Sequence, residues 1–219
     1  TAIYMHEYGR GRMVELIRTA VQNLAGVPSI VFGLFGVGFF VQFVGRAMDA
    51  WHARLTGSQE LVWSQPCLLW AALTLALLTL PVVVVATEEA LRAVPQQYRE
   101  ASLALGATRW QTTWKVVVPQ ALPGILTGGI LSVSRGAGEV APILFTGAAY
   151  FLPELPRTLH SQFMELGYHV YVMSTQSVDV DATLPIQYAT TLVLLALTMA
   201  LNFGAVILRS RTRARLGTL

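Results

Sequence analysis

The chain has 219 residues, of which 54% are hydrophobic and only 12% are charged, and its net charge is +3 at pH 7. Ordinary soluble domains carry about a quarter charged residues. This composition, spread over several long apolar runs, therefore excludes a soluble globular protein and predicts an all-α polytopic membrane protein. A single cysteine, Cys67, excludes an internal disulfide framework, and no group of residues has the spacing of metal ligands.

The first half of the sequence predicts an interfacial helix and two membrane spans. Residues 9–22 carry charged residues among apolar ones, as expected of a helix that lies in the membrane surface. The first span is expected at residues 24–48 and is rich in glycine, which membrane helices tolerate where neighbours pack closely. The second span is expected at residues 67–86. The hinge or packing positions predicted in the first span are Pro28, Gly33 and Gly36.

A polar, charged stretch, Arg99–Pro119, separates the second span from the third. Before it, Thr87, Glu88 and Glu89 are expected to lie where the chain leaves the membrane for water and a new helix begins. Gly106 is expected to supply the left-handed turn that ends one short helix. Thr108 is expected to cap the next short helix, with Gln111 as its reciprocal partner. A membrane protein needs such a stretch between two spans only if another protein docks on it.

The third span, expected at residues 121–145, contains Arg135 and Glu139. A charge inside the bilayer costs at least about 2.5–3.5 kcal/mol, and positions i and i+4 of a helix share a face, so the two side chains are expected to neutralise each other. Either the pair holds helices together, or Arg135 faces a translocation pathway and Glu139 holds it in place. A planar guanidinium matches a tetrahedral oxyanion, which favours an anionic substrate. The hinge or packing positions predicted here are Pro123, Gly124 and Gly128.

The basic residues predict how the chain is oriented. The fourth span is expected at residues 186–208, after an external loop at residues 147–185 that is too long to be a simple connector. Eleven of the fifteen lysines and arginines lie in the N-terminal segment, in residues 88–119 or in the C-terminal tail. Because positive residues concentrate on the cytoplasmic side, residues 88–119 and the C-terminus are expected to be cytoplasmic. The arginine-rich tail is thus explained as the flank of a span, and no nucleic-acid partner is predicted.

Residues 88–119 carry a motif of fixed spacing: Glu100-Ala101-Ser102, three residues, Gly106, nine residues and then Val116-x-Val118-Pro119. This motif resembles the EAA loop of ABC-importer permeases, which docks in a groove of the ATP-hydrolysing subunit. The family pattern has a second alanine where this chain has serine, and Ile and Leu where it has the two valines. The resemblance implies that residues 88–119 form a cytoplasmic coupling loop. The docking residues that it implies are Glu100, Ala101, Gly106, Ala107 and Pro119.

The stretch SVSRGAGEVAPILFTG, which includes Arg135 and Glu139, is similar to a signature of phosphate-importer permeases of the Pst type, and specifically of their PstA-like subunits. With the coupling loop, the resemblance covers residues 1 to about 150. It implies one permease domain, residues 1–219, of the MetI-like fold. That fold has six spans, so four are expected in this chain and two N-terminal spans outside it. It also implies a multi-pass protein of the bacterial inner membrane, a transport subunit rather than an enzyme, that moves inorganic phosphate.

The same resemblance implies several partners. They are a second, PstC-like permease, a dimer of ATP-binding cassette subunits, a periplasmic phosphate-binding protein and the membrane lipid. The sequence contains no G-x-x-x-x-G-K-[ST] phosphate-binding loop. ATP and Mg²⁺ are therefore expected in the ATP-binding subunits, and no cofactor is expected in this one.

Three other functions fit parts of the sequence. The first is an ABC permease for another oxyanion, such as sulfate, molybdate or phosphonate, since the coupling loop alone does not select phosphate. The second is an ion-coupled secondary transporter that uses Glu139 as a proton carrier. The third is a membrane scaffold without transport activity, which a charged pair inside a glycine-rich span disfavours.

Overall fold

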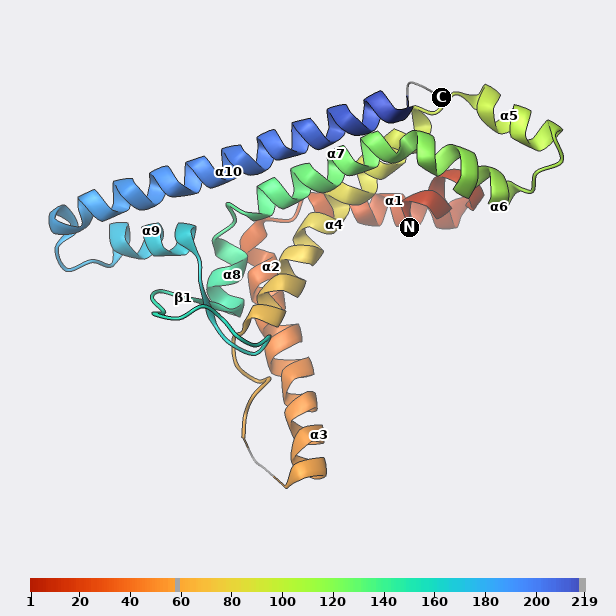
Figure 1. Cartoon of the computed structure of the whole chain (residues 1–219). Coiled ribbons are helices and arrows are strands. Elements are labelled where there is room, and N and C mark those ends of the chain that lie inside the picture. The colour runs from red at the N-terminus through yellow and green to blue at the C-terminus, as the bar shows by residue number, and fades with distance from the viewer. Residues whose placement is uncertain (58–59, 217–219) are drawn as a thin grey trace. The chain divides into compact units, whose positions relative to one another are not determined.

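The computed structural model describes residues 1–57 and 60–216 and is mostly helical (Figure 1). Two short strands, β1 (Ala148–Ala149) and β2 (Phe163–Met164), pair in parallel. Helices labelled η are π-helical. In chain order the helices are η1 (Tyr4–Tyr8), α1 (Arg12–Ala25), α2 (Ser29–Phe35), η2 (Gly36–Gly45), α3 (Arg46–Thr56), α4 (Leu68–Arg92), α5 (Gln96–Ala104), α6 (Arg109–Thr112), η3 (Thr113–Val117), α7 (Val118–Gly136), α8 (Ala141–Thr146), α9 (Leu166–Thr175) and α10 (Val180–Leu216).

Four helical stretches of the described chain are long and apolar enough to cross a membrane. They are Ser29–Thr56, Leu68–Arg92, Arg109–Gly136 and Val180–Leu208. Each overlaps one of the spans predicted from the sequence, so the prediction of four membrane helices in this chain is confirmed.

The start of the first span differs from the prediction. Residues 24–48 are not one helix, because α1 ends at Ala25 and α2 begins at Ser29. Pro28 lies at the N-cap of α2 in an extended conformation (ψ 141°). Proline is favoured near a helix start, where its missing N–H leaves no hydrogen bond unmade. Pro28 therefore begins a helix here and does not bend one.

The third span also differs, because its second half is not helical throughout. Helix α7 ends at Gly136, the chain turns, and the short helix α8 begins only at Ala141. Glycine residues on both sides of Ala137 favour this interruption, since glycine loses the most conformational freedom in a helix. Glu139 lies in the interruption, so the expectation that it shares a helical face with Arg135 is wrong.

Two predicted loops contain regular structure. Helix α4 continues to Arg92, well beyond the predicted end at residue 86, so the first residues of the 88–119 segment are helical. The predicted external loop, residues 147–185, contains both strands, α9 and the first turn of α10.

The chain divides into two compact units. Unit 1 comprises Thr1–Gly26, Thr79–Arg135 and Met199–Leu219, and unit 2 comprises Val27–Leu78 and Gly136–Thr198. Helices α4 and α10 each contribute to both units. The prediction of a single transmembrane domain over residues 1–219 stays a prediction.

In unit 2, a buried aspartate fixes the link between the first two spans. Asp49 of α3 is 5% exposed. Its carboxylate accepts hydrogen bonds from the backbone N–H groups of Val62, Trp63 and Ser64, at 3.1, 2.9 and 2.8 Å, and from the Ser64 hydroxyl at 2.6 Å. A buried charge needs such partners to offset its lost hydration. The link is therefore tied to α3 by its backbone.

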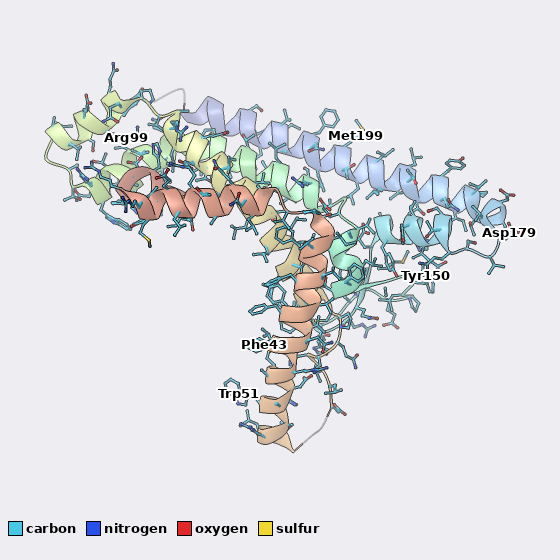
Figure 2. All side chains as sticks on the ribbon, turned by 180° about the vertical axis from the view of Figure 1, so that it is seen from behind. Phe43, Trp51, Arg99, Tyr150, Asp179 and Met199 are labelled. Atoms are coloured by element: carbon cyan, nitrogen blue, oxygen red, sulfur yellow. The ribbon has the colours of Figure 1, made fainter. Side chains whose placement is uncertain are left out.

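The face of the first span that carries Phe43 and Trp51 is apolar and exposed (Figure 2). On another side of the same span, Val41 packs with Cys67 and Trp70 in a small buried core. Cys67 is therefore a packing residue, and the exposed aromatic side chains are of the kind that face lipid or another membrane helix.

Small residues bring helices close together in both units. In unit 2, a Cβ on Gly33 would lie 3.0 Å from backbone atoms of α8, and a Cβ on Gly36 would overlap the Thr74 hydroxyl. In unit 1, α7 lies against α4: a Cβ on Gly124 would lie 2.6 Å from the Ala90 Cβ, and one on Gly128 would overlap the Cβ of Ala86. Close approach of this kind is typical of membrane helices that pack through small residues.

Adjacent glycines of α7 provide a test of this contact. We expect Gly128→Ala to destabilise the protein by about 1–3 kcal/mol, because the new methyl group forces α7 away from α4. We expect Gly129→Ala to be neutral or stabilising by up to about 1 kcal/mol, because no atom lies within 4 Å of its Cβ position. Thermal unfolding of the detergent-solubilised variants measures both effects, and equal shifts for the two would contradict the close packing.

Candidate functional site

The 88–119 segment contains the last turn of α4, the short helix α5, a turn at Gly106 and α6. The second short helix expected after Thr108 is not separate, because α6 continues through η3 into α7 as one helical stretch, Arg109–Gly136. Gly106 has φ +86°, and every residue with positive φ in the described chain is a glycine. A Cβ on Gly106 would meet no atom within 4 Å. The requirement for glycine is therefore one of backbone conformation alone. The turn predicted at this position is confirmed.

Side-chain hydrogen bonds fix the second helix to the turn and to the first helix. The Thr108 hydroxyl accepts from the Gln111 backbone N–H at 3.2 Å, and the Gln111 side-chain oxygen accepts from the Thr108 N–H at 2.9 Å. This is the capping box expected from the sequence. The hydroxyls of Ser102 and Thr112 lie 2.9 Å apart and join α5 to the end of α6. The two helices therefore form one fixed element.

This element exposes most of its surface. Helix α5 has no buried residue, and Leu105 is 90% exposed at the turn, followed by Trp110 at 62%. Large apolar side chains gathered on a short exposed stretch are typical of a protein-binding surface. Of the predicted docking residues, Glu100, Ala101 and Gly106 are exposed, whereas Ala107 and Pro119 are half-buried.

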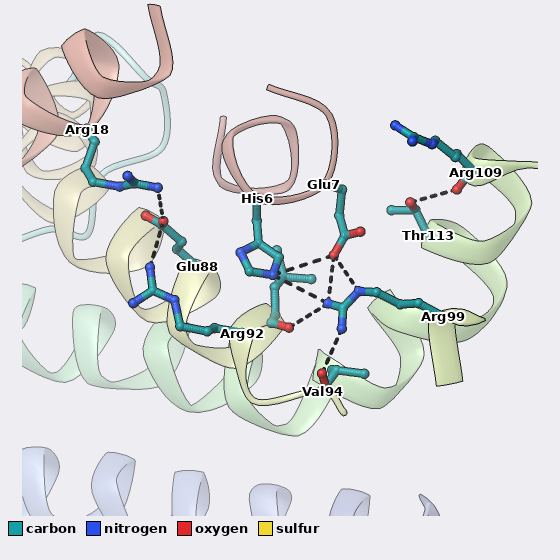
Figure 3. Close-up of polar contacts among 10 residues, drawn as sticks. His6, Glu7, Arg18, Glu88, Arg92, Val94, Arg99, Arg109 and Thr113 are labelled. Carbon is teal, nitrogen blue, oxygen red and sulfur yellow. Dashed lines mark hydrogen bonds and ion pairs between the residues drawn. The ribbon is translucent and has the colours of Figure 1, made fainter. Parts of the chain in front are cut away.

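Arg99 attaches the element to the rest of unit 1 (Figure 3). Its guanidinium donates to the carboxylate of Glu7 in η1, at 2.8 Å through Nη2 and 3.3 Å through Nε. It also donates to two carbonyl oxygens, that of Leu91 in the last turn of α4 at 2.9 Å and that of Val94 in the link after α4 at 2.7 Å. The side chains of Arg99 and Glu7 are each only 12% exposed. Helix α5 is thus held by one charged side chain to two other helices.

A second buried carboxylate lies one turn before the end of α4. Glu88 is 7% exposed, and it accepts from Arg18 of α1 at 2.6 Å and from Arg92 at 3.2 Å (Figure 3). Of the residues predicted at the exit into water, Glu89 is exposed whereas Glu88 is covered by protein, and the position of the exit stays a prediction. Two guanidinium groups stabilise the charge of Glu88 inside the protein, and the same contacts hold α1 against α4.

His6 lies beside the Arg99–Glu7 pair and is neutral at pH 7. Burial is the main cause that lowers the pKa of His6 below its ordinary value of 6.5; the positive charge of Arg99 lowers it further, while the nearby carboxylate of Glu7 opposes both. The positive charge around this histidine therefore comes from arginines.

Arg135 and Glu139 lie at the opposite end of α7 from the coupling loop. Arg135 is in the last turn of the helix and is exposed, and Glu139 is half-buried in the non-helical link after Gly136. Their assignment to a translocation pathway stays a prediction.

Comparison with known proteins identifies the family. Residues 1–214 match the family described as the binding-protein-dependent transport system inner membrane component. The chain belongs to this family. A solved structure titled "Inward facing conformations of the MetNI methionine ABC transporter" contains a similar chain, with a TM-score of 0.66 and 19% identity over 96% of this chain and 83% of that one. The predicted all-α permease fold is confirmed.

The relatives of this transport-system component include phosphate permeases. The chain is 44% identical to phosphate transport system permease protein PstA 1 of Mycobacterium tuberculosis, over 66% of this chain and 41% of that protein. It is 36% identical to the probable ABC transporter permease protein YqgI of Bacillus subtilis, over 82% and 59%. It is 30% identical to PstC of Pasteurella multocida, over 70% and 50%. The chain thus spans about half the length of the curated relatives it matches.

The contacts that hold the coupling loop were missed in the sequence. From the sequence, Arg99 is only one of the basic residues of the 88–119 segment, and no pattern assigns a partner to Glu7 or Glu88. One signal was available: the chain holds only twelve acidic residues, and carboxylates that flank apolar spans are costly unless an arginine pairs with them.

A double-mutant cycle tests the attachment of α5. We expect Arg99→Gln and Glu7→Gln each to destabilise the protein by about 3–5 kcal/mol, because each leaves a buried charge unpaired. The double variant should lose much less than the sum, with a coupling energy above about 1 kcal/mol. Unfolding of the purified variants measures these values.

The matched control is the Arg157–Glu154 pair, whose side chains are 82% and 71% exposed. Its coupling energy should stay below about 1 kcal/mol, because water screens an exposed pair. Equal coupling in the two cycles would show that Arg99 and Glu7 do not hold α5.

Proposed function

We propose that this chain is the permease subunit of an ATP-driven importer that moves inorganic phosphate across the bacterial inner membrane. The observation that supports the ATP-driven part is the coupling loop, which exposes the large apolar side chains of Leu105 and Trp110 and is held to η1 and α4 through Arg99. The family of transport-system components supports it. The identity of 44% with PstA 1 supports phosphate as the substrate. The subunit itself carries no catalysis; ATP and Mg²⁺ bind in the partner.

The proposed complex has four kinds of subunit. The coupling loop docks in a groove on an ATP-binding cassette subunit, two copies of which drive the cycle. A PstC-like permease pairs with this chain, and the similarity of the chain to both PstA 1 and PstC supports two related permeases in one complex. A periplasmic phosphate-binding protein meets residues 147–185, where Phe151 and Leu155 are exposed apolar side chains.

The distribution of basic residues supports a cytoplasmic coupling loop and C-terminus. Arg92 and Arg109 end and begin the two spans that the loop connects. In the C-terminal tail, Arg211 is exposed. The side chains of Arg209, Arg213 and Arg215, which also carry this prediction, lie outside the described residues.

In the proposed cycle, closure of the ATPase dimer displaces α5, and Arg99 passes this displacement to η1 and to the end of α4. A buried cluster at the base of the loop passes it on to α7. Its members are Leu91, Val94, Val117 and Ala121. Because Gly124 and Gly128 leave no space between α7 and α4, the two helices move together in this region. Pro123 lies inside α7 at the same level and is the proposed point of bending.

The far end of α7 carries the proposed substrate contact. At about 1.5 Å per residue the 19 residues of α7 extend about 28 Å, which is close to the thickness of the bilayer core. Arg135 in its last turn therefore reaches the opposite side of the membrane. Its guanidinium offers paired N–H donors to a phosphate ion entering from outside. Glu139 weakens this binding enough for release.

Gly106→Val tests the docking role. We expect it to abolish co-purification of the ATP-binding subunit, because a β-branched residue in the left-handed region costs about 1–2 kcal/mol and displaces the turn. The control is Gly57→Val, since Gly57 also has positive φ (+70°) and open space around its Cβ position. Both variants strain the backbone equally, so loss of the ATPase in both, or in neither, would refute docking at Gly106.

Arg135→Gln tests the pathway role. We expect phosphate uptake into membrane vesicles to fall at least about tenfold, because a charged hydrogen-bond donor is worth about 1.5–3 kcal/mol, while the subunits still co-purify. The exposed Arg54→Gln serves as control and should transport normally. Unchanged uptake by the Arg135 variant would exclude this residue from the pathway.

The same vesicles separate the other functions. Uptake of sulfate or molybdate in place of phosphate would identify another oxyanion permease. Uptake driven by a proton gradient without ATP would identify a secondary transporter, and the absence of any uptake would favour a scaffold.

A further inference from the structure

A basic cavity of about 580 Å³ lies inside unit 1, between η1, the end of α4 and the coupling loop. Its volume is within the range of small-molecule sites, about 300–1,000 Å³. Its wall contains His6 and four arginines: Arg10, Arg92, Arg99 and Arg109. Among the described residues that line it, Glu7 is the one carboxylate. Since His6 is neutral, the wall carries four positive charges against one negative charge.

The four arginines differ in how far their charge is already neutralised. Arg99 is paired with Glu7 at 2.8 Å, and Arg92 shares Glu88 with Arg18. The side chains of Arg10 and Arg109 make no hydrogen bond or ion pair with the described residues, and both are exposed. The cavity therefore presents two available guanidinium groups, one from the link before α1 and one from α6.

The position of the cavity indicates where its ligand comes from. Arg92 is the last residue of the second membrane span, and Arg109 is the first residue of the third. Both residues therefore lie on the same side of the membrane, beyond the apolar parts of these two helices, where long arginine side chains reach toward the lipid headgroups. The wall also includes apolar side chains, those of Val94 and Leu103 among them. A ligand that carries both an anion and an apolar part fits this combination.

We propose that this cavity binds the headgroup of an anionic phospholipid. Arg10 and Arg109 donate to its phosphoryl oxygens, for which the guanidinium fork has matching geometry. Basic pockets between membrane helices bind such headgroups in other proteins. The bound lipid bridges Arg10, in the link before α1, and Arg109, in α6. It thereby stabilises the coupling loop at a place where no described side chain joins these two arginines. This inference goes beyond transport and does not depend on which ion is moved.

Lipid retention tests the proposal without a transport assay. The intact membrane protein, with any subunits that co-purify, is placed in nanodiscs of zwitterionic lipid containing a low fraction of fluorescent phosphatidylglycerol, and its bound fraction is measured. We expect specific binding, weakened about 5-fold by Arg10→Gln and about 25-fold by Arg10→Gln with Arg109→Gln, because each basic residue contributes a similar factor near a charged lipid. Arg10→Lys with Arg109→Lys should retain most of the binding.

The control variant is Arg54→Gln with Arg157→Gln, which removes two exposed arginines of unit 2. It should leave lipid binding unchanged; an equal loss would show that only the net charge of the protein matters and would overturn the site. Inorganic phosphate and glycerol 3-phosphate at millimolar concentration are added as competitors. Displacement of the lipid by either would identify a site for a soluble phosphate and overturn the lipid assignment.

Discussion

The structure of unit 1 depends on the guanidinium of Arg99. It is satisfied by a carboxylate of η1 and by two carbonyl oxygens at and just after the end of α4, all within hydrogen-bonding distance. The Leu91 carbonyl in the last turn of α4 also accepts from the Val94 backbone N–H, and Arg99 adds a charged donor to it and one to the Val94 carbonyl in the link after the helix. Because the pair with Glu7 is nearly buried, its removal from either side leaves an uncompensated charge. In the proposed cycle, the exposed α5–α6 element can pass a displacement to η1 and α4 because Arg99 attaches it to both helices.

In unit 2 a connecting segment is also attached to a helix by a buried charged side chain, but the charge is negative. Asp49 accepts hydrogen bonds from three consecutive backbone N–H groups and a hydroxyl, as Arg99 donates to two backbone carbonyls. Because lipid tails are as apolar as the helices, the hydrophobic effect does little to drive membrane helices together. Their association depends more on the packing of small residues and on polar contacts. In both units the small residues bring the helices together, while one buried charge ties a connecting segment to the end of a span.

The parts of the site that follow from neighbouring residues could be predicted from the sequence. The turn at Gly106 and the Thr108–Gln111 capping box each depend on residues at most three positions apart, and both are present. Arg99 and Glu7 are separated by 92 positions, and no local pattern connects them. The end of α7 was missed for a different reason. Apart from Arg135 and Glu139 the sequence stays largely apolar up to residue 145, so hydropathy predicts a continuous span, whereas the helix ends at Gly136, next to Gly138.

That interruption changes how Arg135 is stabilised in the proposed mechanism. The C-terminus of a helix carries about half a negative charge from its unpaired carbonyl groups, and a cation in the last turn is stabilised by it. Arg135 occupies this position in α7, so the helix end itself offsets part of the cost of holding a guanidinium in the membrane. In this mechanism the substrate contact and the mechanical attachment lie at the two ends of one helix, and the close contact of Gly124 and Gly128 with α4 makes the two helices move as one.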